Sequence, residues 1–246
     1  MRQHFVRSEN DVDAVREDGD TARVRTTIET GLLEQRVIEY EPGRSRDRGE
    51  PRRDELLFVV AGRGTLHLGD ASHALEPDTA AYIRGGETYA VENDGPDDLK
   101  LVSVSAPAEI DGKESEAARR VTIRFADQPE FRADAKRTFR YLVNQDAGCE
   151  TVTQFLGVVE PCRAPDHSHV YDEVGYIVEG QGLAHIEGER LPLTRGSCFH
   201  LPPLQVHCIE NTGPGVMRIL GVFHPSGDPA SREYDAATDL DAVSTS

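Results

Sequence analysis

Three histidines and one glutamate form the most chemically informative pattern in this chain of 246 residues. His167 and His169 are separated by one residue, and Glu173 and His207 follow further along the sequence. Residues i and i+2 of a strand point to the same face, so the first two imidazoles can reach one point in space. Glu173 keeps the same parity and can join them if the residues between stay extended. Imidazole with carboxylate suits Fe, Mn, Ni, Co or Zn, so the spacing predicts a divalent metal site.

Two motifs contain these residues. The first, His-x-His-x-x-x-Glu-x-x-x-x-x-x-Gly, runs from His167 to Gly180, and the second runs from Pro202 through His207 to Asn211. They resemble the two motifs of the cupin superfamily, in which three His and one Glu hold a metal inside a small antiparallel β-barrel. The resemblance implies four metal ligands in this chain: His167, His169, Glu173 and His207.

The chain departs from the cupin pattern at two positions. Pro161 stands where the first motif usually begins with Gly, and Leu204 stands where the second motif has Gly. Neither residue is a ligand, so the departures concern the geometry of the loops more than metal binding.

The sequence also contains an internal repeat. A shift of 118 positions lays Glu55 on Glu173 and Asn93 on Asn211, without a gap between about residues 49 and 107. Internal similarity at a fixed spacing indicates repeated structural units. The chain therefore resembles a bicupin, with two copies of one domain.

The first copy lacks most of the metal-binding residues. Three different residues occupy the positions of the three histidines: Gly49, Pro51 and Tyr89. Only Glu55 remains, and a lone carboxylate does not make a transition-metal site. We therefore expect one metal per chain, in the C-terminal copy.

Short strand-like runs separated by Gly, Pro, Asp and Asn predict an all-β protein. With the resemblance, the expected fold is two tandem double-stranded β-helix (jelly-roll, cupin) barrels. Clear strand runs are Leu56–Val60, Val121–Ile123, Thr151–Val159 and Met217–Phe223. The expected organisation is an arm at 1–25, disordered or exchanged between subunits, a degenerate cupin domain at 26–107, a linker at 108–120, a metal-binding domain at 121–226 and a tail at 227–246.

Composition limits the partners. The formal net charge of −17 disfavours binding to nucleic acid or to anionic membrane surfaces. No apolar run approaches the ~20 residues of a membrane span, and the N-terminus lacks a signal peptide core, so we predict a cytoplasmic protein. Its four cysteines are expected to be reduced. Barrels with exposed edges and long arms commonly pair, so a homodimer or higher homo-oligomer is expected.

Residues near the ligands suggest further roles. Strand parity continues the metal-facing side of the chain to Gly175 and Ile177. Gly175 would leave volume for a substrate or relieve crowding, and Ile177 would form a pocket wall. If residues 202–205 close a hairpin, His200 lies opposite His207 and acts as a hydrogen-bonding partner or proton-transfer group near the metal. Otherwise His200 is a structural histidine with its own hydrogen-bond partner. Glu173 and His200 are thus the catalytic candidates.

Four protein ligands leave one or two open positions on the metal for a small organic substrate or dioxygen. Among the metals, Fe, Mn or Ni is favoured, and Zn, Co or Cu is possible. No cluster of Arg or Lys beside the ligands suggests a carboxylate-binding site, and the pocket is expected to be apolar. We therefore predict a dioxygenase acting on an enol, catechol or diketone. The alternatives are an isomerase, decarboxylase or lyase that needs no dioxygen, or a non-catalytic cupin that binds or senses a small molecule.

Overall fold

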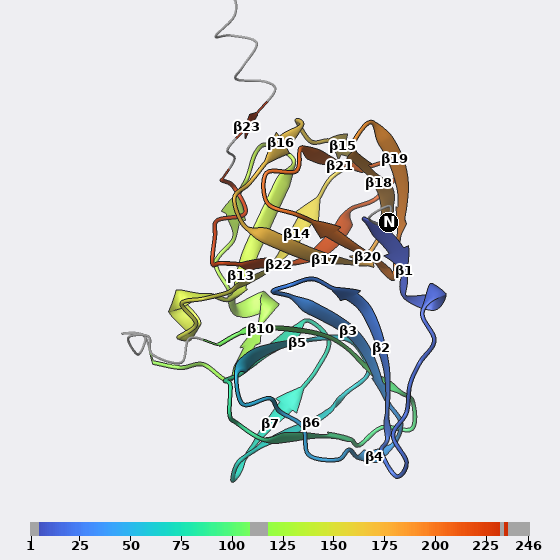
Figure 1. Ribbon diagram of the computed structural model, residues 1–246, viewed down its shortest axis with the longest axis vertical. Coiled ribbons are helices and arrows are strands. Elements are labelled where there is room, and N and C mark those ends of the chain that lie inside the picture. Colours follow the sequence, from blue (N-terminus) through green and yellow to red (C-terminus); the bar gives the residue numbers. More distant parts are fainter. Residues whose placement is uncertain (1–4, 109–117, 232–233, 236–246) are drawn as a thin grey trace, which may run out of the picture.

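The computed structural model describes residues 5–108, 118–231 and 234–235, and within these residues the chain consists of β-strands with short 3-10 turns (Figure 1). The predicted all-β class is confirmed. The turns are η1 (Glu9–Asp11), η2 (Phe125–Asp127) and η3 (Gln145–Ala147). No helix in this part of the chain has the length and apolar character that crossing a membrane requires.

The N-terminal domain is a sandwich of two antiparallel sheets. Its inner sheet has the strand order β11 (Thr122–Arg124), β8 (Thr79–Ile83), β5 (Arg53–Ala61), β10 (Leu99–Pro107), β3 (Glu34–Tyr40) and β2 (Ala22–Glu29). Its outer sheet has the order β4 (Gly43–Arg44), β9 (Tyr89–Asn93), β6 (Gly64–Leu68) and β7 (Ala71–Leu75). One apolar cluster fills the space between the two sheets.

The C-terminal domain repeats this plan. Its inner sheet has the order β1 (Val6–Ser8), β20 (Ser197–Leu201), β17 (Asp172–Glu179), β22 (Met217–His224), β14 (Thr153–Val159), β13 (Arg137–Val143) and β12 (Phe131–Arg132). Its outer sheet has the order β19 (Glu189–Thr194), β18 (Gln181–Ile186), β21 (His207–Asn211), β16 (His167–Ser168) and β23 (Tyr234–Asp235), and β15 (Cys162–Arg163) also pairs with β21. Across the described residues the sheets of each domain stay separate, so each jelly roll is an open sandwich rather than a closed barrel.

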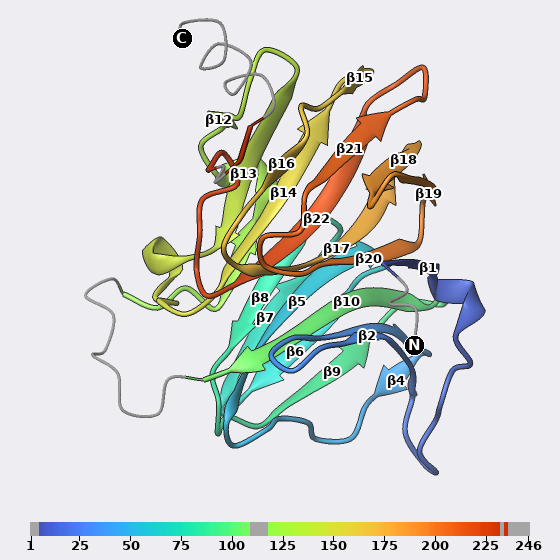
Figure 2. The ribbon, with the colours of Figure 1, turned by 45° about the horizontal axis from the view of Figure 1, so that its top comes forward.

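The two inner sheets pack back to back, and Figures 1 and 2 show the strands of one lying over those of the other. The largest apolar cluster lies between them and combines Leu56 and Phe58 from β5 with Val174 and Tyr176 from β17. The alternate residues of β5 face the interior of the N-terminal domain. Burial of both faces explains why β5 reads as an unbroken apolar run.

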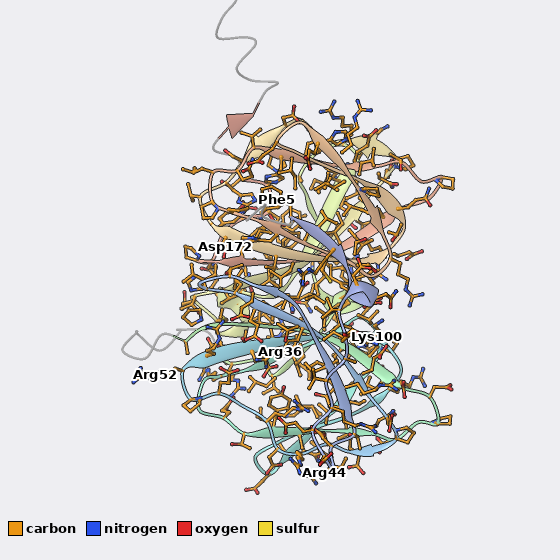
Figure 3. The ribbon with its side chains drawn as sticks, turned by 45° about the vertical axis from the view of Figure 1, so that its right-hand side comes forward. Phe5, Arg36, Arg44, Arg52, Lys100 and Asp172 are labelled. Atoms are coloured by element: carbon orange, nitrogen blue, oxygen red, sulfur yellow. The ribbon has the colours of Figure 1, made fainter. Side chains whose placement is uncertain are left out.

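Each domain receives a strand from the other half of the chain. The N-terminal strand β1 pairs with β20, with Val6 opposite Phe199, and β11 pairs with β8. Strand β1 of the expected arm thus joins the C-terminal domain of its own chain, whereas the end of that arm, from Ala22, begins β2 of the N-terminal domain. Directly after β1, the buried Glu9 accepts from Lys100 Nζ at 2.6 Å and from the Tyr176 hydroxyl at 3.0 Å, so it links both domains. Figure 3 labels Lys100, which lies close to this N-terminal segment.

The expected linker and tail lie partly outside the described residues. In the linker, residues 109–117 lie outside them. The described part of the tail packs on the C-terminal domain, because the Tyr171 hydroxyl donates to the carbonyl of Asp228 and β23 pairs with β16. The four cysteines are free, as expected.

Candidate metal centre

Both sheets of the C-terminal domain contribute to the candidate centre. In the outer sheet, β16 places His167 directly opposite His207 of β21. In the inner sheet, β17 carries Glu173. His169 lies in the connection that crosses from β16 to β17, so this segment does not follow the extended path that strand parity assumed. Glu173 reaches the centre because the chain changes sheets.

The loop before β21 holds this crossing in place. The Leu204 N–H donates to the carbonyl of His169 at 2.7 Å. Leu204 itself adopts a left-handed conformation with φ of 63°, which a residue with a side chain rarely takes up. This explains why the cupin motif usually has Gly there, and it shows that the chain keeps the loop geometry despite the departure.

Three of the four predicted ligands lie close together. The ligand atoms of His169, Glu173 and His207 are all within 4.8 Å of one another, and the three side chains are buried. His167 is half-buried beside them, with its ring centroid 4.4 Å from that of His207 and 6.4 Å from that of His169. It therefore stands next to this trio rather than within it.

All three imidazoles make the same kind of backbone contact. Nδ1 faces a main-chain carbonyl two residues away at 3.0 Å in His167, 3.1 Å in His169 and 2.8 Å in His207. A carbonyl oxygen only accepts, so each Nδ1 carries the ring proton and donates it. In the neutral rings the lone pair is then on Nε2. In this tautomer a histidine can bind a metal through Nε2.

The contact between His169 and Glu173 fits a cation. Nε2 of His169 and Oε2 of Glu173 lie 2.8 Å apart, yet Nε2 is buried and has no partner with hydrogen-bond geometry among the described residues. With the proton on Nδ1, the two facing atoms are both acceptors and repel unless a second proton or a metal neutralises them. The donor set and this orphaned nitrogen therefore suit a divalent transition metal.

Burial and neighbouring charges shift the pKa values of these rings in opposite directions. Burial lowers the pKa of His169, but its contact with Glu173 outweighs that effect and leaves the pKa raised. For His207, burial and the nearby His167 lower the pKa to about 4. His207 is therefore neutral near pH 7 and can ligate, whereas a metal at His169 would replace a favourably held proton.

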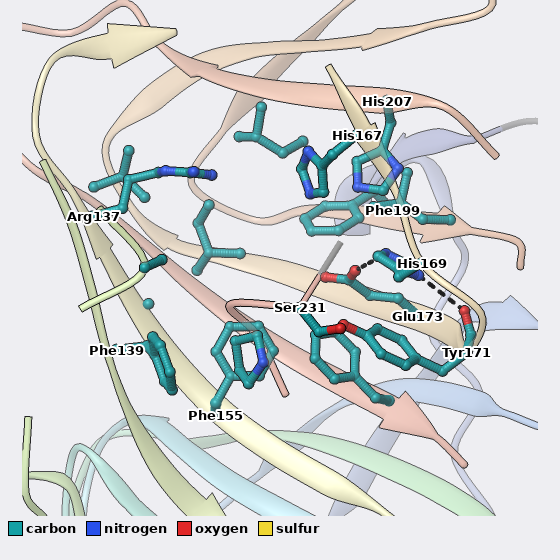
Figure 4. A pocket seen from close by; sticks show the side chains of 18 of the residues that line it. Arg137, Phe139, Phe155, His167, His169, Tyr171, Glu173, Phe199, His207 and Ser231 are labelled. Carbon is teal, nitrogen blue, oxygen red and sulfur yellow. Dashed lines mark hydrogen bonds and ion pairs between the residues drawn. The ribbon is translucent and has the colours of Figure 1, made fainter. Parts of the chain in front are cut away.

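A largely apolar pocket opens beside the trio (Figure 4). The space between its walls measures about 740 Å³, including its opening to solvent. Aromatic and aliphatic side chains make up most of the wall, among them Phe139, Phe155, Val159, Phe199, Leu201, Ile209, Ile219 and Phe223. Such a site suits a small organic ligand with an apolar body.

The structure decides between the two readings of Gly175. A Cβ atom there would lie 2.0 Å from Cζ of Phe199, so the missing side chain admits this ring rather than a substrate. The expectation of free volume at Gly175 is wrong. Ile177 is buried in the apolar cluster that includes Phe199, and it does not form the expected pocket wall among the described lining residues.

The predicted neighbour relation between His200 and His207 is also wrong. β20 belongs to the inner sheet and pairs with β17, where His200 stands opposite Val174, whereas β21 belongs to the outer sheet. Neighbouring residues on this face point toward the N-terminal domain. Nε2 of His200 instead lies 2.6 Å from Oδ1 of Asp172, whose other oxygen accepts from Thr30 of the N-terminal domain at 2.8 Å. His200 thus belongs to the interface between the two domains. Of the two catalytic candidates, Glu173 is the one that lies at the candidate metal centre.

Arg137 lines the pocket, although it was not among the residues predicted to lie there. It begins β13, and its Nε donates to Asp134 Oδ2 at 2.7 Å. The contact pairs Arg137 with a carboxylate whose pKa is lowered: burial opposes the charged form, but hydrogen bonds from Lys136 and Arg137 outweigh it. The alternation of Arg137 with Phe139, which lines the same pocket, is the signal that could have identified it.

The N-terminal domain contains a different arrangement at the corresponding positions. Glu55 is buried and accepts from the Ser103 hydroxyl, while the fully buried Tyr89 occupies the position of His207. Burial, reinforced by Glu55, raises the pKa of Tyr89. Within the described ranges, the group formed by His169, Glu173 and His207 is the one set of three or more candidate ligands that could hold a metal.

Comparison with known proteins identifies the family. The Cupin_2 family, described as a cupin domain, matches residues 36–105 and 156–223, which together make up more than half of the chain. The chain therefore belongs to this family, with one match in each half, and the predicted bicupin resemblance is confirmed.

Two curated relatives match part of the chain. The uncharacterized protein MJ1618 of Methanocaldococcus jannaschii is 35% identical over 60 residues, which cover 24% of this chain and 48% of the relative. An uncharacterized protein of Aquifex aeolicus is 29% identical over 77 residues, covering 31% of this chain and 63% of the relative. The chain thus spans less than two thirds of the length of each of these relatives.

Solved bicupin-sized structures resemble the whole fold. A Pseudomonas aeruginosa protein named as glyoxylate induced has a TM-score of 0.77 at 19% identity, covering 95% of this chain and 92% of that one. Oxalate decarboxylase from Bacillus subtilis has a TM-score of 0.73 at 14% identity, covering 93% and 78%. The E. coli protein YlbA has a TM-score of 0.73 at 12% identity, covering 91% of each chain. At these identities the likeness concerns the fold.

Proposed function

We propose that the C-terminal domain holds one divalent transition metal per chain and acts as a dioxygenase on a small enol, catechol or diketone. The observation that carries the proposal is the shared tautomer of the three imidazoles beside Glu173. Their Nδ1 protons are held by main-chain carbonyls, and the orphaned Nε2 of His169 lies in a buried trio at an apolar pocket. Three ligands from the trio, with His167 as the fourth, would leave open positions for substrate and dioxygen.

The protein's own residues would perform four tasks. Main-chain carbonyls orient the imidazoles, and the Glu173 carboxylate offsets part of the metal charge. The phenyl rings of Phe155, Phe199 and Phe223 exclude water and orient an apolar substrate. Glu173 is also the group at the centre that can accept a proton from a hydroxyl of the substrate. A bound Fe, Mn or Ni would supply the electron transfer between substrate and dioxygen.

A redox-neutral decarboxylase, isomerase or lyase is the second candidate. Arg137 favours it, because a cation in the pocket suits a substrate with a carboxylate. The fold likeness to oxalate decarboxylase is compatible with this alternative. A non-catalytic cupin that binds a small molecule is the third candidate.

Metal analysis followed by oxygen uptake tests the proposal. Elemental analysis of the purified protein should find one equivalent of a redox-active metal per chain. Oxygen consumption with a panel of enols, catechols and flavonols should then require that metal. Turnover that persists under strict anaerobiosis would favour the redox-neutral alternative, and tight binding without product would favour the non-catalytic one.

We further propose that the protein forms a homodimer or higher homo-oligomer. Strands at the edges of both inner sheets could pair with a second copy. Light scattering on the eluted peak from a sizing column tests this, and a mass near the 27.1 kDa of one chain would contradict it.

A further inference from the structure

We propose that the pocket binds an organic anion, whose carboxylate or similar planar oxyanion pairs with Arg137 while its apolar body lies against the aromatic wall. This inference rests on the proposed function only in that the same pocket adjoins the metal site. It names the substrate class that the proposed function leaves open.

The pairing of Arg137 is incomplete. Asp134 occupies Nε of the guanidinium, but Nη2 is buried and has no hydrogen-bond partner among the described residues. Leaving a charged donor unsatisfied in a buried position is costly, more so than for a neutral group. A ligand that accepts from Nη2 would remove this cost.

Arg137 differs in this respect from other half-buried arginines of the chain. Four of them also have one buried nitrogen without a partner, and in each it is Nε: Arg23, Arg48, Arg119 and Arg140. Their outer Nη groups are paired with carboxylates or main-chain carbonyls. In Arg137 the arrangement is reversed, so that Nε is satisfied and an outer nitrogen is left for another molecule.

The side chain of Arg137 lines the pocket. Figure 4 shows its guanidinium extending from the wall toward His167, on the side of the pocket opposite Phe155 and Phe139. Guanidinium groups bind carboxylates through parallel N–H donors, which gives both strength and orientation. One end of a ligand would thus be held at Arg137 while another part reaches the trio.

Charge and wall composition limit which anion can bind. The formal net charge of −17 repels anions at long range, so the pocket can hold one only through a local cation such as Arg137. The remaining wall is largely apolar, which suits a carboxylate attached to an aromatic or aliphatic body better than a small, fully charged dianion.

Calorimetric titration with simple probes tests the proposal without requiring turnover. The probes are benzoate, phenylacetate and cinnamate, each compared with its neutral amide, and the protein is loaded with Zn²⁺ so that no oxidation intervenes. The wild type should bind the best carboxylate roughly 10- to 100-fold more tightly than its amide. Arg137→Gln should lose this preference and Arg137→Lys should retain part of it, because Lys keeps the charge without the fork.

The matched control is Arg132→Gln, which removes an exposed arginine from the neighbouring strand β12 and should leave the preference unchanged. Metal content of every variant is measured separately. Absence of any preference in the wild type, absence of saturable binding by all three carboxylates, or an unchanged preference in Arg137→Gln would overturn the proposal.

The same titration on metal-free wild type separates this inference from the proposed function. A preference for carboxylates that depends on Arg137 and persists without metal supports the anion site, even if the protein proves to have no oxygenase activity. The opposite outcome is that the wild type loses the preference when the metal is removed, and that metal-loaded Arg137→Gln keeps it. This outcome assigns carboxylate binding to the metal and overturns the role of Arg137.

Discussion

The two domains share one fold but use their interiors differently. In the N-terminal domain a single apolar cluster joins the sheets, and Tyr40 and Tyr89 are fully buried in it. In the C-terminal domain the interior apolar residues form two separate clusters, and members of both line the pocket beside the trio. The comparison shows that the same sandwich can hold either a continuous core or a site with a cavity, depending on a few side chains.

One pair of register positions illustrates this difference. In the N-terminal domain Leu57 stands opposite Ala81, and at the positions 118 residues later Gly175 stands opposite Phe199. The larger residue of the pair is on β5 in the N-terminal domain, but in the C-terminal domain it is on β20, the neighbour of β17. The ring of Phe199 covers Gly175 and forms part of the pocket wall, whereas Leu57 packs into the continuous core.

The carboxylates of Glu55 and Glu173 also differ in their surroundings. Glu55 is retained in the N-terminal domain but is used in a hydrogen bond with Ser103 and lies near a buried tyrosine. Glu173 instead faces an orphaned imidazole nitrogen. A retained residue therefore does not imply a retained site, because its neighbours decide its chemistry.

The largest effect is expected from removing a ligand in the C-terminal domain, and the control is Glu55, the one ligand-type residue retained at the corresponding positions of the N-terminal domain. His169→Ala should weaken metal binding by at least about 100-fold, since even partners of a ligand are worth 10–100-fold. Glu55→Ala should leave metal content unchanged. Elemental analysis and competition with a chelator measure both. Two metal equivalents per wild-type chain would contradict the assignment of a single site.

Filling the space above Gly175 tests the exchange of volume between strands. Gly175→Ala should lower the free energy of unfolding by about 1–3 kcal/mol, because the new Cβ overlaps the ring of Phe199. Adding Phe199→Leu should recover part of this loss by removing the ring. Urea denaturation measures both variants, and a double variant that is less stable than Gly175→Ala would argue against direct overlap.

Acidification should lower the affinity for the metal, and the N-terminal domain should not affect this pH dependence. The pKa of His169 is raised above its usual value, so its Nε2 takes up a proton as the pH falls through that raised pKa, and this proton competes with the metal. Affinity should fall about tenfold per pH unit below it for one competing proton. His207, with a pKa of about 4, adds a second proton only in stronger acid. Chelator competition across pH measures the slope, and Glu55→Ala should follow the wild-type curve.

The smallest effect is expected at the seam between the domains. His200→Gln should leave metal content and any activity within about twofold of wild type, and should cost about 1 kcal/mol of stability through the lost contact with Asp172. His207→Gln is the matched control and should lose metal. A loss of activity in His200→Gln at normal metal content would return His200 to the reaction.

Much of the fold and the core of the site could be predicted because these features are local or repeated. The strand runs at Leu56–Val60 and Met217–Phe223 fall within β5 and β22. The cross-strand pairing of His167 with His207 follows the expectation that His207 arrives from another strand. The repeat indicated two domains, and the loss of three histidines indicated which domain could hold a metal.

The errors all concern which segments become neighbours in the folded chain. His200 and His207 are close in the chain but belong to different sheets, so their spacing could not show that they face different environments. The partner of Gly175 is set by the register between β17 and β20. Arg137 reaches the pocket only because β13 pairs with β14 in the inner sheet, next to the edge strand β12.

The sequence by itself determined the all-β class, the two related domains and the residues that can ligate a metal, because strand periodicity and motif spacing act over a few residues. The tertiary structure alone decided how the site is completed. The crossing at His169 brings ligands from two sheets together, the ring of Phe199 occupies the space over Gly175, and Arg137 joins the pocket. These outcomes depend on strand register and on the packing of one sheet against another, which are set by the folded chain as a whole.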